Sequence, residues 1–257
     1  MRHTDLRGKT VVVTGASRGL GRALVDLLVG EGVQVACLAR PSDALAELAR
    51  VHGEMVLPVA CDMGDLGQID SAIETVVGKF GRIDALVNNA AIFQPFLLEE
   101  ARAEQIEQHF RINVIGPAWL MRAAIPHLRA ARGQIISVSS ESVRMPFPFL
   151  TIYAATKGAL EVLSAGLREE LRDQGIRVSV LRAGSMTGGS GDRDWAPDVA
   201  HRFFERIQQT GHAHFTGEAA AQESVASVVL DLLTLPPDVN IDLIEARGAA
   251  ALSIHPN

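Results

Sequence analysis

The chain is poor in cysteine, in aromatic residues and in clustered charge. Its 257 residues include two cysteines, Cys37 and Cys61, and aromatic residues make up 5% of the total. Both cysteines fall in expected strands, and we interpret them as buried free thiols in a reducing cytoplasm. No basic run is present and the formal net charge is −6, so nucleic acid is not an expected partner.

Long apolar runs and spaced metal ligands are also missing. No segment approaches the roughly 20 apolar residues that a membrane helix needs, and the N-terminal "MRHTDLRGKT" contains no apolar signal segment. We therefore expect a cytoplasmic protein without a membrane partner. No cluster of His, Cys, Asp or Glu has ligand spacing, so no metal is expected. His212 and His214 are interpreted as surface residues.

What the chain does have is a regular alternation of apolar and amphipathic segments. Strands are expected over residues 10–15, 33–39, 54–62, 83–91, 133–140, 176–184 and 240–248. Helices are expected over residues 19–32, 42–53, 68–81, 103–132 and 153–175. This order predicts an α/β protein with a seven-stranded parallel sheet covered by helices on both faces, the doubly wound Rossmann fold. We expect a single domain over residues 1–257, in which the irregular segment 185–215 covers the substrate.

A glycine-rich turn, "TGASRGLG", follows the first strand and opens the first helix. Gly15, Gly19 and Gly21 allow a tight turn and a close approach of the backbone to a phosphate, and the helix N-terminus supplies free N–H groups. The second strand ends at Arg40 without the carboxylate that commonly binds the ribose 2′-OH of NAD. Together with Arg18, Arg40 favours the 2′-phosphate of NADP(H) over NAD(H). The alternative is a pair of solvated surface arginines.

Tyr153 and Lys157 lie four positions apart in "YAATK" and share one helix face. A neighbouring ammonium stabilises a phenolate, so we expect Lys157 to lower the pKa of Tyr153. A phenol adjusted in this way can give or take a proton at a carbonyl or alcohol oxygen. Tyr153 is the only tyrosine in the chain, which makes a packing role alone a weak explanation.

With Asn113 and with Ser140, 13 residues before Tyr153, these motifs resemble the short-chain dehydrogenase/reductase family, in its NADP-preferring branch. The resemblance implies interconversion of a carbonyl and a secondary alcohol. It assigns the proton transfer to Tyr153, substrate-oxygen binding to Ser140, ribose binding to Lys157 and a water-mediated proton relay to Asn113. Apart from the resemblance, Asn113 could be a cap at a break in a long helix, and Ser140 could be part of a polar strand end.

The same resemblance implies a set of cofactor contacts along the chain. They are Gly15, Ser17, Arg18, Gly19, Leu20, Gly21, Arg40, Asp62, Met63, Asn89, Ala90, Ala91, Tyr153, Lys157, Gly184, Ser185 and Met186. Asp62 has two interpretations, an acceptor for the adenine amino group or the N-cap of the next helix. The loop after the sixth strand departs from the family, because Ala183-Gly184 replaces its Pro-Gly and Thr187 follows one residue early. The nicotinamide contacts of this loop are therefore open.

Aromatic residues after the fourth and fifth strands and in segment 185–215 indicate an apolar or aromatic carbonyl substrate. The residues expected to contact the substrate are Ser140, Tyr153, Phe93, Phe147 and Trp195, and Glu141 is a further candidate for the pocket lining. The resemblance also implies a homodimer or homotetramer. A non-catalytic NADP(H)-binding regulatory protein is the alternative function. A lyase-like relative would lack the glycine turn and the lysine, which are both present.

Overall fold

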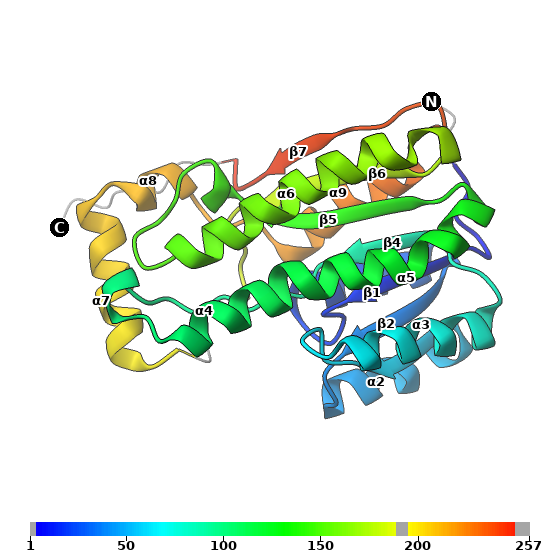
Figure 1. The fold of residues 1–257 in the computed structure, drawn as a ribbon, viewed down its shortest axis with the longest axis horizontal. Coiled ribbons are helices and arrows are strands. Elements are labelled where there is room, and N and C mark those ends of the chain that lie inside the picture. Colours follow the sequence, from blue (N-terminus) through cyan, green and yellow to red (C-terminus); the bar gives the residue numbers. More distant parts are fainter. Residues whose placement is uncertain (1–3, 189–194, 250–257) are drawn as a thin grey trace.

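The computed structural model describes residues 4–188 and 195–249, in which seven parallel strands form one sheet (Figure 1). Their order across the sheet is β3-β2-β1-β4-β5-β6-β7. The strands are β1 Thr10–Thr14, β2 Gln34–Ala39, β3 Val56–Ala60, β4 Ala85–Asn88, β5 Gln134–Ser140, β6 Arg177–Ala183 and β7 Leu243–Ala246. The predicted α/β fold is confirmed, whereas the prediction of one domain over residues 1–257 stays a prediction.

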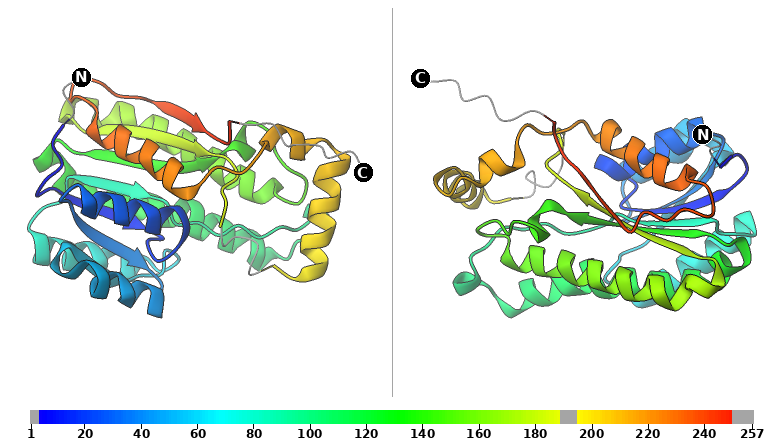
Figure 2. Two further views of the ribbon diagram at one scale, coloured as in Figure 1. Left: turned by 180° about the vertical axis from the view of Figure 1, so that it is seen from behind. Right: turned by 90° about the horizontal axis from the view of Figure 1, so that it is seen from above.

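Helices cover both faces of this sheet (Figure 2). One face carries α1 Gly19–Gly30, α2 Asp43–His52 and α9 Gln222–Thr234. The other carries α3 Leu66–Phe80, α5 Gly116–Ala131 and α6 Thr151–Leu171. Side chains of a strand alternate between the faces, so Val11 and Val13 pack with the first group and Val12 with the second. The first core includes Cys37 and the second Cys61; both thiols are free and buried.

Two further helices, α7 Pro197–Gln209 and α8 His212–Thr216, stand beyond the ends toward which the strands point (Figure 1). They belong to the segment that the sequence predicts to cover the substrate, of which residues 189–194 lie outside the described part. Phe203 of α7 and Phe215 of α8 join an aromatic cluster that also contains Tyr153. The carboxyl ends of the strands are where parallel sheets place ligands.

The expected helix over 103–132 is interrupted. It consists of α4 Ala103–Phe110, a π-helical turn Arg111–Ile115 and α5 Gly116–Ala131. The wider turn lets Gly116 pass so close to the Met63 carbonyl that a Cβ there would lie 2.1 Å from its oxygen. Such π turns are rare and often occur at functional sites. Asn113 lies in the middle of this turn and is buried.

Three smaller expectations are wrong. The expected third strand is too long, since β3 begins at Val56 and ends before Cys61. The N-cap of α3 is Asp65, which accepts hydrogen bonds from the Gly67 and Gln68 amides, whereas Asp62 accepts from the Gly64 amide in the turn before it. The sequence reading also omitted α9 between β6 and β7.

Candidate active site

The glycine-rich turn lies beside the exits of its two neighbouring strands. The Gly15 amide donates to the Leu38 carbonyl of β2 at 2.8 Å. On the other side, the Thr14 hydroxyl accepts the backbone amides of Asn89 and Ala90, each at 2.9 Å. The residues predicted to bind the dinucleotide come from β1, α1 and β4, and the structure brings them together at the carboxyl ends of the strands.

The N-terminus of α1 fits an anionic group. Arg18 is its N-cap and makes no side-chain cap, and no acidic residue occupies the first turn. A Cβ added to Gly21 would lie 2.3 Å from the Gly15 carbonyl oxygen and 2.7 Å from Asn89 Nδ2, so only glycine lets the helix start so close to the turn. Ser17 is partly exposed in the turn, Leu20 is buried in the core beneath it, and the positive end of the helix faces outward.

The predicted 2′-phosphate corner lies next to this turn, at the end of β2. Arg18 and Arg40 are both exposed there. The Cys61 amide donates to the Ala39 carbonyl at 2.9 Å, so the segment that leads into Asp62 runs beside the end of β2, and Met63 after it is buried. Ala91, which follows β4, is also exposed. The corner at the end of β2 therefore presents two cationic side chains, and Asp62 follows the neighbouring strand β3.

Two polar residues of α6, one turn apart, form hydrogen bonds with β5. Lys157 Nζ donates to the Val138 carbonyl at 2.8 Å, and the Ser139 hydroxyl donates to Glu161 at 2.6 Å. Because Lys157 and Glu161 are four positions apart, they share one helix face. Arg182 of β6 binds the same Glu161 carboxylate through two nitrogens, at 2.8 and 2.7 Å. These contacts fix the depth of α6 against the sheet and with it the position of Tyr153, one turn before Lys157.

The Ser140 hydroxyl lies close enough to the Tyr153 phenol to act on its pKa, and Lys157 Nζ lies 5.8 Å from the centre of the tyrosine ring. Burial raises the pKa of Tyr153 to about 12; the Ser140 hydroxyl opposes this rise, and Glu141 adds to it. Burial also lowers the pKa of Lys157 to about 8, against the charge of Glu161. The expected lowering of the tyrosine pKa is therefore wrong for this structure, because desolvation outweighs the opposing effect of Ser140.

Asn113 uses its side chain to hold the exit of β4. Its Oδ1 accepts the Ile92 amide at 2.8 Å, and its Nδ2 donates to the Ile92 carbonyl at 3.0 Å and to Thr156 at 3.1 Å. Thr156 precedes Lys157, so Asn113 ties the π turn, the β4 exit and α6 together. Its predicted part in a proton relay stays a prediction.

The loop after β6 is tied to the segment before α9. The Ala220 amide donates to the Ser185 carbonyl at 3.0 Å, and the Thr187 amide donates to the Ala220 carbonyl at 2.8 Å. In such a parallel bridge, the backbone groups of the middle residue, Met186, point the other way. Gly184 donates to the Ala246 carbonyl at 2.8 Å. The Met186 backbone is therefore the part of this loop that can meet a nicotinamide carboxamide.

The four aromatic residues among the predicted substrate contacts, Phe93, Phe147, Tyr153 and Trp195, belong to one cluster. The Phe93 ring meets the Tyr153 ring edge-on, with centroids 4.8 Å apart. Trp195 packs against Phe93 at 5.1 Å and donates its Nε1–H to the Phe93 carbonyl at 2.9 Å. Phe147 is buried in the same cluster. Phe149 in this cluster has a positive φ of 68°, which is rare for a bulky residue and marks local strain.

Sequence reasoning missed three residues that hold the site. Thr14 joins β1 to the β4 exit, Thr156 meets Asn113, and Glu161 connects Ser139 to Arg182. Thr14 and Thr156 stand inside the motifs "TGASRGLG" and "YAATK", so their positions were visible. Glu161 could have been found from its position: it is a charged residue one helical turn after Lys157, on the helix face that packs against the sheet.

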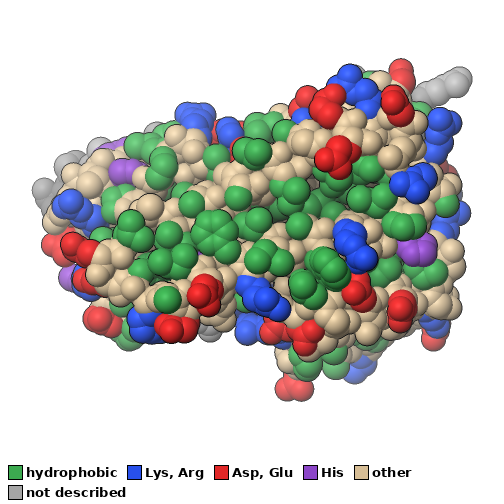
Figure 3. Space-filling model, viewed as in Figure 1, with side chains coloured by type: hydrophobic (Ala, Val, Ile, Leu, Met, Phe, Trp, Pro, Cys, Tyr) green, Lys and Arg blue, Asp and Glu red, His purple; other side chains and the backbone are tan. Residues whose placement is uncertain are grey.

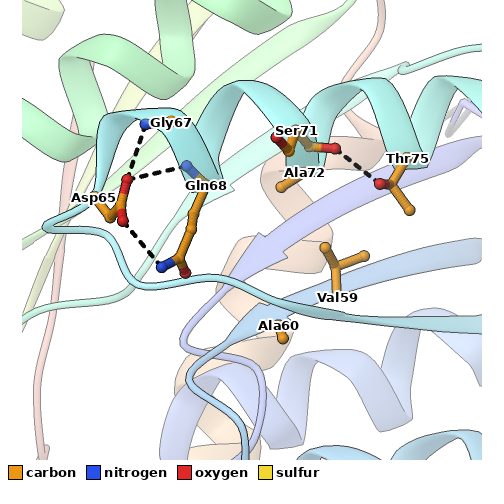
Figure 4. A pocket seen from close by; sticks show the side chains of 8 residues that line it. All are labelled: Val59, Ala60, Asp65, Gly67, Gln68, Ser71, Ala72 and Thr75. Carbon is orange, nitrogen blue, oxygen red and sulfur yellow. Dashed lines mark hydrogen bonds between the residues drawn. The ribbon is translucent and has the colours of Figure 1, made fainter.

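A hollow between β3 and α3 is not part of this site (Figure 4). Its polar lining residues Asp65 and Gln68 bond to each other and to the start of α3. The strand β3 lies at the sheet edge, four strands from β5, so the hollow is far from Tyr153. Across residues 4–188 and 195–249, no group of side chains has the makings of a metal site and no helix is long and apolar enough to cross a membrane.

Comparison with known proteins identifies the family. A family model described as short chain dehydrogenase matches residues 9–194. The chain belongs to the short-chain dehydrogenase family. A sorbitol dehydrogenase from Cereibacter sphaeroides is 31% identical over 242 residues, which cover 91% of this chain and 93% of that protein.

Two solved structures of this family share the fold. A short chain dehydrogenase from Burkholderia cenocepacia J2315 in complex with NADP is similar with a TM-score of 0.79 and 26% identity, over 95% of this chain and 98% of that one. A 3-ketoacyl-(acyl-carrier-protein) reductase from Brucella melitensis complexed with NADH gives 0.82 and 25%, over 95% and 98%. The protein is thus an oxidoreductase that acts on CH–OH or carbonyl groups with a nicotinamide cofactor.

Proposed function

We propose that this short-chain dehydrogenase interconverts a carbonyl and a secondary alcohol with NADP(H). The observation that carries the proposal is the convergence of Ser140, Tyr153 and the buried Lys157 amine, whose Nζ lies 5.8 Å from the centre of the tyrosine ring. The bound nicotinamide supplies or accepts the hydride. Ser140 and Tyr153 hold the substrate oxygen, and Tyr153 gives its proton to that oxygen in reduction and takes it back in oxidation.

The other catalytic groups act on Tyr153 and on the cofactor. Lys157 stabilises the tyrosinate that remains after proton transfer and binds the ribose hydroxyls. Asn113 supports a relay that returns a proton from solvent, and its contacts to Ile92 and Thr156 hold the π turn in place for this. Gly15, Gly19 and Gly21 receive the pyrophosphate at the uncapped start of α1.

The preference for NADP(H) rests on the exposed Arg18 and Arg40 at the end of β2. Guanidinium groups pair with phosphate oxygens through several hydrogen bonds, whereas an unmodified ribose offers them no charge. The substrate is proposed to have an apolar or aromatic part that lies against Phe93, Phe147 and Trp195, which already form one cluster with Tyr153. Neither nucleic acid nor a membrane is a proposed partner.

The tyrosine role is tested by Tyr153→Phe. The substitution keeps the ring that packs on Phe93 but removes the proton donor, so kcat should fall by about 100-fold or more. NADPH binding, followed by quenching of tryptophan fluorescence, should stay close to that of the wild type. Retention of near-normal kcat would show that another group transfers the proton.

The cofactor preference is tested by Arg40→Asp. Loss of a cation and gain of an anion should weaken NADPH binding about 10–100-fold, the size of a charge-assisted hydrogen bond, and change NADH binding much less. Arg50→Asp on the exposed face of α2 is the matched control for a charge reversal. Equal effects of Arg40→Asp on both cofactors would mean that this corner does not recognise the 2′-phosphate.

Two further proposals concern the whole protein. We propose a homodimer or homotetramer, which the exposed side chains of Ile115 and Val162 on the face formed by α5 and α6 support. We also propose a cytoplasmic location, which fits two cysteines that are free and buried.

A further inference from the structure

The carboxyl group of Glu141 is buried immediately after Ser140. Glu141 begins the 3-10 turn Glu141–Val143 that follows β5, and only 5% of its surface is exposed. Its Oε1 accepts a hydrogen bond of 2.7 Å from the Thr216 hydroxyl at the end of α8. Its Oε2 finds no hydrogen-bond partner among the described residues. A buried carboxyl oxygen without a donor is costly, so a donor from outside the chain is the simplest explanation.

This oxygen lies beside the start of the loop that follows β6. A methyl group added at Gly184 would lie 3.3 Å from Glu141 Oε2. Gly184 opens the loop whose Met186 backbone is free to meet the cofactor, and Ser140 pairs with Ala183, the residue before Gly184. Glu141 Oε2 therefore lies between the segment that carries Ser140 and the loop predicted to hold the nicotinamide.

No group in residues 4–188 or 195–249 forms a hydrogen bond with Glu141 Oε2. The Arg247 guanidinium, whose charge acts on Glu141, donates to the Phe215 carbonyl at 2.9 Å. The Ser185 amide lowers the pKa of Glu141, but its position does not satisfy Oε2 as a hydrogen-bond donor. Burial nevertheless raises the pKa of Glu141, with a smaller contribution from Glu245. The chain thus keeps an acidic group beside Ser140 although its burial costs free energy of folding. The hydrogen bond from Thr216 involves only one of the two carboxyl oxygens.

Taking the proposed alcohol–carbonyl chemistry as given, we propose that Glu141 Oε2 accepts a hydrogen bond from a second substrate hydroxyl, on the carbon next to the one that reacts. When Ser140 and Tyr153 hold the reacting oxygen, the neighbouring carbon can place its hydroxyl toward the residue that follows Ser140. The preferred substrates are therefore vicinal diols and the matching α-hydroxy carbonyls. The aromatic cluster of Phe93 and Trp195 receives the apolar remainder of such a molecule.

The test compares cis-1,2-cyclohexanediol with cyclohexanol, which share one ring and differ by the second hydroxyl. The wild type should oxidise the diol with at least a tenfold higher kcat/KM. Glu141→Ala should lower kcat/KM for the diol about 10–100-fold, the loss of a hydrogen bond to a charged group, and change that for cyclohexanol less than about threefold. Glu141→Gln keeps the side-chain volume and serves where alanine disturbs folding. Glu245→Gln removes a nearby negative charge and should leave the ratio of the two substrates unchanged.

Binding separates this inference from the proposed function. If the protein turns over neither these alcohols nor any ketone or alcohol in a broad panel, the proposed function fails, but calorimetry on its NADPH complex still gives Kd values for both compounds. At least tenfold tighter binding of the diol, lost in Glu141→Ala and reduced in Glu141→Gln, supports the inference. A wild type without preference for the diol, or an equal loss for both compounds in the variants, overturns it and leaves Glu141 as an anchor of the loop.

Discussion

At the scale of single residues, the buried amine of Lys157 controls the pH range of the site. Burial lowers its pKa to about 8, although the Glu161 carboxylate one turn later acts in the opposite direction. The ammonium form is therefore complete well below pH 8 and disappears as the pH rises through that value. The neutral amine still reaches the Val138 carbonyl, but it no longer offers a charge to Tyr153.

We therefore predict that carbonyl reduction declines as the pH rises through about 8. The reason is that a neutral Lys157 cannot stabilise the tyrosinate left by proton transfer, so the decline approaches tenfold per pH unit. The measurement is kcat/KM for a ketone between pH 6 and about 10 at saturating NADPH. Lys157→Arg keeps a charge at all these pH values, and its remaining activity should show no decline near pH 8. A decline with the same midpoint in both proteins would assign it to another group.

The residues of this site differ in how far the sequence could predict them. Tyr153, Lys157 and Ser140 stand at family spacing, and the structure brings them together at the end of β5. The direction of the tyrosine pKa was missed because it depends on burial against Phe93 and the aromatic cluster, whose members come from distant parts of the chain. The spare oxygen of Glu141 could not be predicted either, since its surroundings come from Gly184 and Thr216, far along the chain.

At the scale of elements, the break between α4 and α5 shows what periodicity hides. Apolar residues continue at helical spacing through residues 103–132, so the pattern predicts one helix. The π turn in the structure is accompanied by two tertiary contacts: Asn113 bonds to Ile92 and Thr156, and Gly116 passes against the Met63 carbonyl. Asparagine is a weak helix former, which was the available signal for a break.

The omission of α9 had a signal in the topology itself. Parallel neighbours such as β6 and β7 cannot be joined by a hairpin, and their connection crosses one face of the sheet, usually as a helix. Val225, Val229 and Leu232 recur at helical spacing in that connection and are buried against α1 and the sheet. The expected strands therefore already required a helix between residues 184 and 240.

At the scale of the whole molecule, the face over α5 and α6 is unusual for its exposed apolar side chains. Hydrophobic residues lie across the middle of this face, with charged residues mostly toward its margins (Figure 3). Val162 on α6 is 74% exposed, and Ile115 before α5 is 45% exposed. Contiguous apolar surface of this kind commonly marks an interface between proteins.

We predict that the protein forms a homodimer or homotetramer and that this helical face contributes to the contact. A charge at Val162 would be desolvated in such an interface without a partner, so Val162→Asp should weaken association by about tenfold or more. Light scattering coupled to size-exclusion chromatography over a range of concentrations measures the mass. Val51→Asp on α2 is the matched control, because Val51 is 52% exposed on the opposite side of the sheet. A monomeric wild type would refute the prediction, and equal dissociation of both variants would place the contact elsewhere.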